Sequence, residues 1–213
     1  MKRATVLLAD DHKIVAEGLK GILEPEFDLV AIVEDGRALL TAADTLHPDV
    51  IIADISMPLL NGIEAVRQIK KKDENIMVVF LTMHPDVSYA ASAFDAGASG
   101  YVLKHSAPSE LITAIHSVLA GKTYITPLLA GDLMLFYKER RHEQRNPATR
   151  LTARQKEVIQ LHAEGRTTKE IASLLNISPR TVEFHKYRLM QEFGLKNSVE
   201  LIHFALKHKI ISI

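Results

Sequence analysis

Short apolar runs alternate with stretches of helical periodicity along the first 120 residues. Each run is rich in β-branched side chains and ends in a turn signal, which is the pattern of a buried parallel strand. Between the runs, apolar residues recur three and four positions apart, which predicts amphipathic helices. The five predicted strands cover residues 5–10, 29–33, 50–54, 76–82 and 100–104. Five strand–helix units in succession predict an α/β fold with a doubly wound, five-stranded parallel sheet.

The pattern changes beyond this region. From about residue 126 the alternation of strands and helices stops, and residues 138–150 (KERRHEQRNPATR) are mostly charged. We interpret residues 123–149 as a linker whose first part is compatible with a helix. The remaining residues, 150–213, have helical periodicity only and predict a small all-α domain.

The start signals in this last domain are typical of a helix-turn-helix. A tight turn at residues 176–177 separates a short helix from a longer one, which is capped by Ser178 and has Pro179 at its first position. A longer second helix after a short turn is the arrangement that DNA-binding helix-turn-helix proteins use. Two capping boxes begin the preceding helices, pairing Thr152 with Gln155 and Thr167 with Glu170.

Polar side chains stand at the carboxyl ends of four predicted strands. In an open α/β sheet these strand ends meet in one crevice, where ligands bind. Three carboxylates, a hydroxyl and an ammonium are expected to converge there, a set that suits a Mg²⁺ ion and a phosphoryl group. The histidines show no metal-ligand spacing along the sequence. The converging residues are Asp10, Asp11, Asp54, Thr82 and Lys104.

Composition narrows the possible classes of protein. The chain has 213 residues, of which 47% are apolar and 24% charged, as in ordinary globular domains. It has no cysteine and no apolar run of membrane-spanning length, and we recognise no signal peptide, so we expect a cytoplasmic protein without a membrane partner. Residues 1–125 hold 11 Lys and Arg against 17 Asp and Glu, whereas residues 126–213 hold 15 against 9. An acidic half joined to a basic half favours a metal-binding or signalling module attached to a nucleic-acid binder.

Several motifs of the chain resemble those of one family. Residues 1–120 resemble a response-regulator receiver domain, and residues 150–213 resemble a LuxR-type helix-turn-helix domain. In this order the two resemble the NarL/FixJ class of two-component response regulators. The resemblance implies a flavodoxin-like receiver at 1–122, a linker at 123–149 and a DNA-binding domain at 150–213. The motifs that carry it are Asp10-Asp11, residues 54–62 (DISMPLLNG), Thr82, residues 97–104 (GASGYVLK) and residues 151–198.

The resemblance also implies roles for residues of the acidic site. Asp54 would be the phosphoacceptor for a sensor histidine kinase. Mg²⁺ would be bound by Asp10, Asp11, Asp54 and the backbone carbonyl of Ser56. Thr82 and Lys104 would bind the phosphoryl group, and Tyr101 would be the aromatic residue of the switch.

Two neighbours of Thr82 are less regular. We hypothesise that Met83 restricts the access of water to the aspartyl phosphate. We interpret His84 as a solvated loop histidine.

The helix predicted at residues 179–193 has an outward face that is separate from its core positions. Arg180, Glu183, Phe184 and Tyr187 follow helical spacing on that face, where a recognition helix meets base edges in the major groove. Many relatives carry lysine where this chain has Glu183, so no base preference is carried over. The residues placed to reach phosphates are Lys169, Thr181, Lys186 and Arg188.

We therefore expect a two-component response regulator that is not an enzyme, beyond reacting with small phosphodonors and dephosphorylating itself. Phosphorylation would switch dimerisation, interdomain release, or both, and so control DNA binding by a homodimer. Three alternatives remain at this point. They are a Mg²⁺-dependent phosphohydrolase that works through an aspartyl phosphate, a constitutive DNA binder with an unused receiver, and a receiver whose helical domain binds protein rather than DNA.

Overall fold

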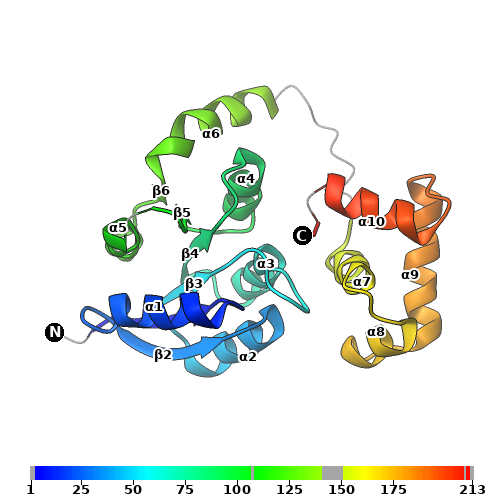
Figure 1. Ribbon diagram of the computed structural model, residues 1–213, viewed down its shortest axis with the longest axis horizontal. Coiled ribbons are helices and arrows are strands. Elements are labelled where there is room, and N and C mark those ends of the chain that lie inside the picture. The colour runs from blue at the N-terminus through cyan, green and yellow to red at the C-terminus, as the bar shows by residue number, and fades with distance from the viewer. Residues whose placement is uncertain (1–2, 107, 141–150, 209, 212–213) are drawn as a thin grey trace. The chain divides into compact units, whose positions relative to one another are not determined.

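The computed structural model describes residues 3–106, 108–140, 151–208 and 210–211 (Figure 1). The chain forms two compact units, residues 1–144 and 145–213. No helix of the described residues is long and apolar enough to cross a bilayer.

The first unit is a parallel sheet with the strand order β2-β1-β3-β4-β5-β6. The predicted α/β class and doubly wound topology are confirmed, but the sheet has six strands rather than five. The additional strand, β6, has two residues and pairs with β5 at Gly100 and Tyr101. The strands are β1 (Thr5–Ala9), β2 (Asp28–Val33), β3 (Val50–Ala53), β4 (Met77–Thr82), β5 (Gly100–Leu103) and β6 (Tyr124–Ile125).

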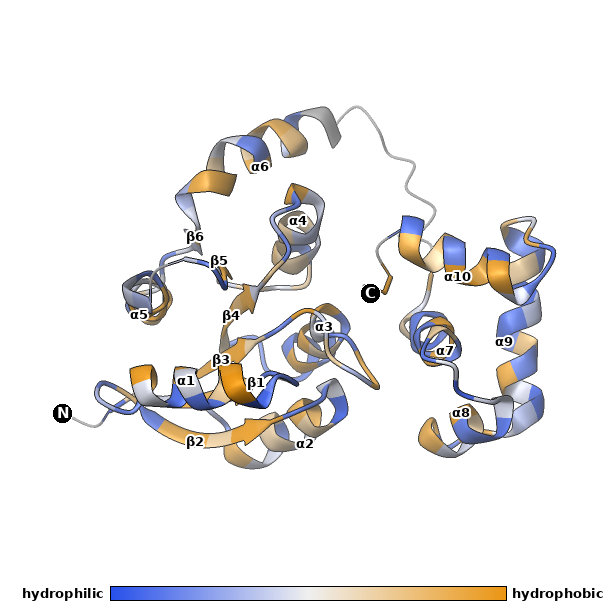
Figure 2. Ribbon diagram, viewed as in Figure 1, coloured by the Kyte–Doolittle hydropathy of each residue, from blue (hydrophilic) through white to orange (hydrophobic). Residues whose placement is uncertain are grey.

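Helices cover both faces of this sheet. Alternate strand residues point to opposite faces, so each strand contributes side chains to both cores. In β1, Leu7 belongs to the core beneath one layer of helices, whereas Leu8 belongs to the core beneath the other. The first layer contains α2 (Gly36–Leu46), α3 (Gly62–Lys72) and α4 (Val87–Asp95), and the second contains α1 (Lys13–Leu23) and α5 (Pro108–Leu119). The four inner strands, β1, β3, β4 and β5, are mostly buried and are therefore largely apolar (Figure 2).

A further helix, α6 (Pro127–Arg140), follows β6 and packs along α4 (Figure 1). Leu129 is buried in the core beneath α4, and the Tyr137 hydroxyl donates hydrogen bonds to the Ala91 carbonyl and to Asp95 Oδ1, at 3.3 and 3.2 Å. The helical start that the sequence allowed for the linker is thus a helix that packs on the first unit. Residues 141–149 of the predicted linker, and residue 150 after it, lie outside the described residues.

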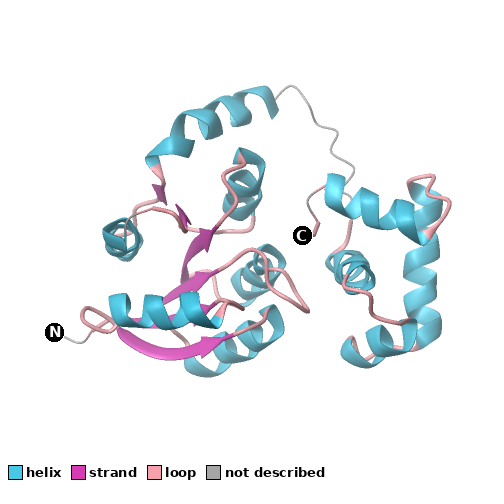
Figure 3. Ribbon diagram, in the orientation of Figure 1, coloured by secondary structure: helices cyan, strands magenta, loops and turns pink. Residues whose placement is uncertain are grey.

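In the described residues, the second unit is all helical (Figure 3). Both capping boxes form as predicted, and Ser178 caps α9 by accepting a hydrogen bond from the Thr181 backbone. Asn176 adopts the left-handed conformation, with φ of 51°, in the turn between α8 and α9. These local features confirm the helix-turn-helix arrangement. Its helices are α7 (Ala153–Ala163), α8 (Thr168–Leu174), α9 (Pro179–Glu192) and α10 (Ser198–Lys207).

Candidate functional site

Two buried carboxylates and an ammonium group meet at the carboxyl edge of the sheet. Asp10 directly follows β1 and Asp54 directly follows β3, the neighbouring strands between which the strand order reverses. Lys104 follows β5, and its Nζ lies 2.7 Å from Asp10 Oδ2 and 2.6 Å from Asp54 Oδ2. The crevice at such a switch point is where ligands bind in doubly wound folds. Three of the residues predicted to converge are thus in direct contact.

Asp11 and His12 complete an acidic cluster beside this contact. Asp11 Oδ1 lies 2.8 Å from His12 Nδ1, and Asp10 Oδ1 lies 3.3 Å from the same nitrogen. One ligand atom from each of Asp10, Asp11, His12 and Asp54 fits within a span of 4.8 Å. Asp11 Oδ1 is buried and, apart from this contact with His12, has no hydrogen-bond partner, so a lone pair is available to a cation. The donor set therefore fits a divalent cation, and His12 is a member that sequence spacing did not reveal.

Asp54 is held in position by the chain that follows it. Its Oδ1 accepts the backbone N–H of Ile55 at 2.6 Å and that of Ser56 at 3.4 Å. Gly62 begins α3 directly beneath, where an added Cβ would lie 2.0 Å from the Asp54 carbonyl oxygen. Glycine is therefore required at this position, because only glycine allows this close approach of two backbone segments.

His84 joins the segments around Asp54 to Tyr101. Its Nε2 is 2.7 Å from Ser56 Oγ, its ring stacks on Tyr89 at 4.2 Å, and its carbonyl accepts the Tyr101 hydroxyl at 2.8 Å. Its backbone N–H donates to Thr82 Oγ1 at 3.4 Å. The interpretation of His84 as a solvated loop histidine was therefore wrong, because three other segments hold it. This role is visible only in the three-dimensional contacts of His84, because nothing in the neighbouring sequence distinguishes this histidine from other loop residues.

Burial and neighbouring charges change the pKa values of two side chains at this edge of the sheet, Lys104 and Tyr101. Burial by itself lowers the pKa of Lys104, but the hydrogen bonds and negative charges of Asp10 and Asp54 outweigh it and raise the pKa above its ordinary value. Burial, followed by the charge of Asp86, raises the pKa of the Tyr101 hydroxyl. Lys104 is therefore a permanent cation, and Tyr101 is a permanent hydrogen-bond donor. Tyr101 is fully buried in β5, and Thr82 is fully buried in the neighbouring strand β4, where it pairs with Leu103.

In the second unit, α9 presents the predicted outward face. Arg180, Glu183, Phe184 and Tyr187 are all exposed, whereas Val182 and Leu189 are buried in its core. The predicted phosphate contacts are also at the surface: Lys169 and Arg188 are exposed, and Thr181 and Lys186 are half-buried.

The carboxylate of Glu183 is engaged in a hydrogen bond within the second unit. It accepts a hydrogen bond from the hydroxyl of Thr168 at 2.5 Å, which ties α9 to the start of α8. The carboxylate therefore has a partner within this unit.

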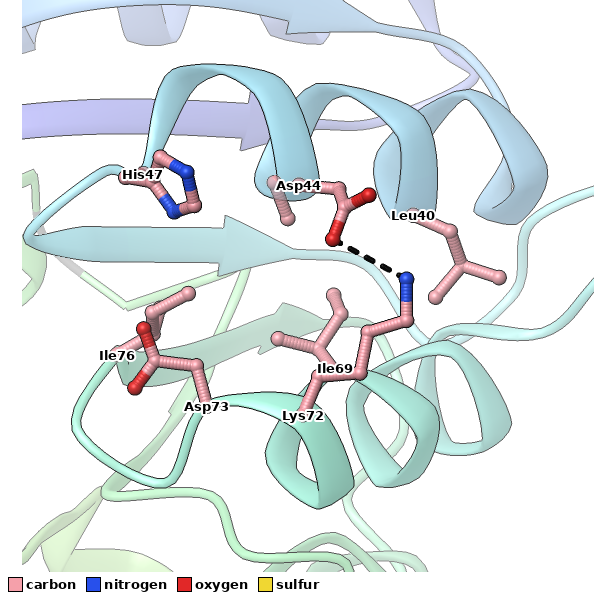
Figure 4. Close-up of a pocket in the computed structure, with 8 residues that line it drawn as sticks. Leu40, Asp44, His47, Ile69, Lys72, Asp73 and Ile76 are labelled. Atoms are coloured by element: carbon pink, nitrogen blue, oxygen red, sulfur yellow. Dashed lines mark hydrogen bonds and ion pairs between the residues drawn. The ribbon is translucent and has the colours of Figure 1, made fainter.

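A separate cavity of about 200 Å³ lies between the C-terminal ends of α2 and α3 (Figure 4). The Lys72 ammonium crosses it to reach Asp44 at 3.1 Å. Its lining residues precede β3 and β4 in the chain, so the cavity is at the opposite edge of the sheet from Asp54. It shares no residue with the acidic cluster.

Comparison with known proteins identifies both units. Residues 6–116 match the response regulator receiver domain, and residues 149–205 match the bacterial regulatory proteins of the luxR family. Response regulator UvrY of Escherichia coli K12 is 33% identical over 95% of this chain and 94% of its own. A structure of the Salmonella typhimurium response regulator RcsB is 29% identical, covers 96% of this chain and 97% of its own, and has a TM-score of 0.64. A structure of an RcsB–DNA complex is 30% identical, covers 95% and 98%, and has a TM-score of 0.60.

These likenesses extend over nearly the whole chain and over nearly the whole of each relative. The chain therefore belongs to the response regulators that join a receiver domain to a LuxR-type helix-turn-helix domain, the NarL/FixJ class. It is a transcription regulator of that class.

Proposed function

We propose that Asp54 is the phosphoacceptor through which a sensor histidine kinase controls this regulator. In the transfer, a carboxylate oxygen of Asp54 attacks the phosphorus, and the bond from phosphorus to the kinase histidine nitrogen breaks. The nitrogen keeps the electron pair. The observation that carries the proposal is the contact of the Lys104 ammonium with both Asp10 and Asp54 beside the partly exposed Asp11. These contacts support the proposal, because in the proposed roles they would bring a nucleophile, a phosphoryl-binding cation and metal ligands together in one crevice.

The same residues suit a Mg²⁺ ion. Asp10, Asp11, Asp54 and the backbone carbonyl of Ser56 offer the oxygen ligands that this ion prefers, and Asp11 Oδ1 has a lone pair to spare. When bound, Mg²⁺ neutralises the negative charge that develops on the phosphoryl oxygens. Lys104 Nζ then exchanges its contact with Asp54 Oδ2 for one with a phosphoryl oxygen, while it keeps Asp10 as its partner.

Thr82 and Tyr101 transmit the change. The Thr82 hydroxyl moves from the His84 backbone N–H, 3.4 Å away, to the phosphoryl group. His84 also binds Ser56 and Tyr101, so this movement reaches α4 and β5. We propose that the altered face promotes dimerisation, releases the DNA-binding unit, or does both. A regulator of this kind needs only one phosphorylation per switching event, and we propose no multiple-turnover activity.

We propose that the second unit binds double-stranded DNA through α9 and that the phosphorylated protein acts as a homodimer. The basic balance of this half and the exposed face of α9 support DNA binding. The relative RcsB has been solved with DNA, including two dimers on two parallel DNAs. The assigned contacts remain Arg180, Glu183, Phe184 and Tyr187 for bases, and Lys169, Thr181, Lys186 and Arg188 for phosphates.

The proposed functional division has a receiver at 1–122, a connecting segment at 123–149 and a DNA-binding domain at 150–213. Within the connecting segment, β6 and α6 pack on the receiver. Because the target is DNA, we place the protein in the bacterial cytoplasm.

The test is phosphorylation of the purified chain with acetyl phosphate, with and without Mg²⁺, read by mass and by binding to duplexes selected from a random pool. We expect one added phosphoryl group and tighter DNA binding, both dependent on Mg²⁺ and abolished in Asp54→Asn. Asp44→Asn, on the exposed surface of α2, is the matched control and retains both. Equal DNA binding in every condition would make this a constitutive DNA binder. Absence of modification in the wild-type chain would remove Asp54 as the phosphoacceptor.

A further inference from the structure

His12 occupies the position just before α1, yet its imidazole does not cap that helix. A side chain at this position commonly accepts a backbone N–H from the first helical turn, and His12 makes no such hydrogen bond. Its ring faces the carboxylates instead, with Nδ1 at 2.8 Å from Asp11 Oδ1 and 3.3 Å from Asp10 Oδ1. The side chain is 62% exposed, so burial does not force this orientation.

The spacing of these three atoms matches the coordination shell of a small divalent cation. Two ligands at right angles, each about 2.1 Å from an octahedral ion, lie about 3.0 Å apart. The observed distances from His12 Nδ1 to the two carboxylate oxygens fall on either side of that value. Both distances therefore allow His12 Nδ1 and a carboxylate oxygen of Asp10 or Asp11 to be neighbouring ligands of one octahedral ion.

Asp10 uses its two oxygens in different directions. Its Oδ2 binds the Lys104 ammonium, whereas its Oδ1 faces His12 and accepts the His12 backbone N–H at 2.9 Å. Asp11 Oδ1 is buried, and apart from its contact with the imidazole nitrogen it has no hydrogen-bond partner. A cation bound at this face is thus separated from Lys104 by the Asp10 carboxylate and would give this oxygen a second partner.

We propose that His12 Nδ1 is a ligand of the cation in this site, and that the site consequently binds divalent transition ions such as Mn²⁺ and Co²⁺ more tightly than Mg²⁺. The proposal rests on the proposed function in that it places a cation at the acidic cluster. Imidazole nitrogen suits transition ions, whereas Mg²⁺ selects oxygen ligands and retains its waters. A nitrogen ligand therefore adds affinity for the first group and little for the second.

The experiment uses the full chain loaded with Mn²⁺. Free Mn²⁺ is counted by its electron paramagnetic resonance signal, Mg²⁺ affinity is obtained by competition, and electron spin echo modulation detects nitrogen bound to Mn²⁺. We expect a nitrogen coupling in the wild-type chain that His12→Ala abolishes. That variant should lose at least about tenfold in Mn²⁺ affinity, while its Mg²⁺ affinity changes by less than about threefold. His12→Gln keeps a polar side chain of similar length and should also lose the coupling.

The matched control is His105→Ala, which removes an exposed histidine at the same edge of the sheet, outside the acidic cluster. It should retain the coupling and the affinity. Mn²⁺ bound without nitrogen coupling, or coupling that survives in His12→Ala, would overturn the role of His12 and leave the acidic site of the proposed function intact. Failure of the wild-type chain to bind either Mn²⁺ or Mg²⁺ would overturn both proposals.

Discussion

The Lys104 ammonium lies 2.6 Å from Oδ2 of Asp54, and both side chains are almost fully buried. Removing one partner of a buried ion pair leaves an uncompensated charge and costs more than the pair itself contributes. Asp10 lies on the other side of the same ammonium group, so loss of Lys104 would leave two adjacent buried carboxylates. The ammonium group thus keeps the site stable while no divalent cation neutralises it.

Replacement of Lys104 by methionine should therefore destabilise the first unit by about 3 kcal/mol in the absence of Mg²⁺. Mg²⁺ should restore more stability to Lys104→Met than to the wild type, because the cation takes over the neutralising role. Chemical denaturation with and without Mg²⁺ measures both effects. Lys72→Met is the control, since the Lys72–Asp44 pair is exposed and should cost less than about 1 kcal/mol. Equal losses in the two variants would contradict the argument.

Gly62 provides a second test, on the backbone next to Asp54, the proposed phosphoacceptor. A methyl group here would collide with the Asp54 carbonyl oxygen, so Gly62→Ala must displace either α3 or Asp54. We expect a loss of at least about 2 kcal/mol in unfolding free energy and impaired phosphorylation by acetyl phosphate.

The control for Gly62→Ala is the same change in α6. An added Cβ at Gly131 meets nothing within 4 Å, and alanine in a helix interior is favoured by about 0.5–1 kcal/mol. Gly131→Ala should thus raise stability. A stable, fully phosphorylated Gly62→Ala would show that the close approach is not required.

The main strands could be predicted because burial on both faces makes each of them a continuous apolar run. β6 could not, since two residues contain no measurable period. α6 was difficult for a related reason: apolar residues such as Leu128, Leu129 and Met134 lie on different sides of it, so it lacks the polar face that identifies an amphipathic helix (Figure 2).

The acidic site was predictable from the rule that parallel strands end at one edge, which brought Asp10, Asp54 and Lys104 together. The rule concerns strand ends alone. It says nothing about His12, whose ring could equally have faced solvent. It also says nothing about His84, because its partner Ser56 lies in the loop after β3 and its partner Tyr101 lies in β5. Such contacts depend on side-chain directions that a sequence pattern does not specify.

Tyr101→Phe tests the hydrogen bond between Tyr101, the proposed aromatic residue of the switch, and the loop after β4. The variant keeps the buried ring but removes the hydroxyl that donates to the His84 carbonyl. We expect a loss of about 1 kcal/mol and faster hydrogen exchange in residues 83–89 of the unphosphorylated protein. Tyr187→Phe, which removes an exposed hydroxyl in α9, is the control. Unchanged exchange at residues 83–89 would mean that the hydroxyl does not restrain the loop.

The second unit should lose stability as the pH falls below about 6.5. Burial, followed by the positive charge of Lys186, lowers the pKa of His162, and burial also lowers the pKa of His185 and His208. The unfolded chain then binds protons that the folded chain does not. The full stability is therefore present above the unfolded pKa, and it declines as the pH falls toward the folded pKa values.

His162→Gln should reduce that dependence on pH. Hydrogen exchange of α7, corrected for intrinsic rates and compared at pH 7.5 and 5.5, gives the local stability. The wild type should lose protection at pH 5.5, and His162→Gln should lose less. His116→Gln, on α5 of the first unit, should behave as the wild type does in α7. An identical pH response in wild type and His162→Gln would exclude His162 as a source of the effect.

The two kinds of contact assigned to α9 can be separated by salt. Arg180 lies on the N-terminal part of the outward face, where we propose a base contact, and Arg188 lies two turns further along, where we propose a phosphate contact. Arg180→Ala should change the sequences recovered from a random duplex pool and cost about 1–3 kcal/mol for the preferred site. Arg188→Ala should recover the same sequences, weaken binding to all of them alike, and lower the slope of log affinity against log salt by about 1. Each variant is the matched control for the other, because both remove one exposed arginine from one helix. If both variants changed only the salt slope, α9 would contact the DNA backbone without reading its sequence through Arg180.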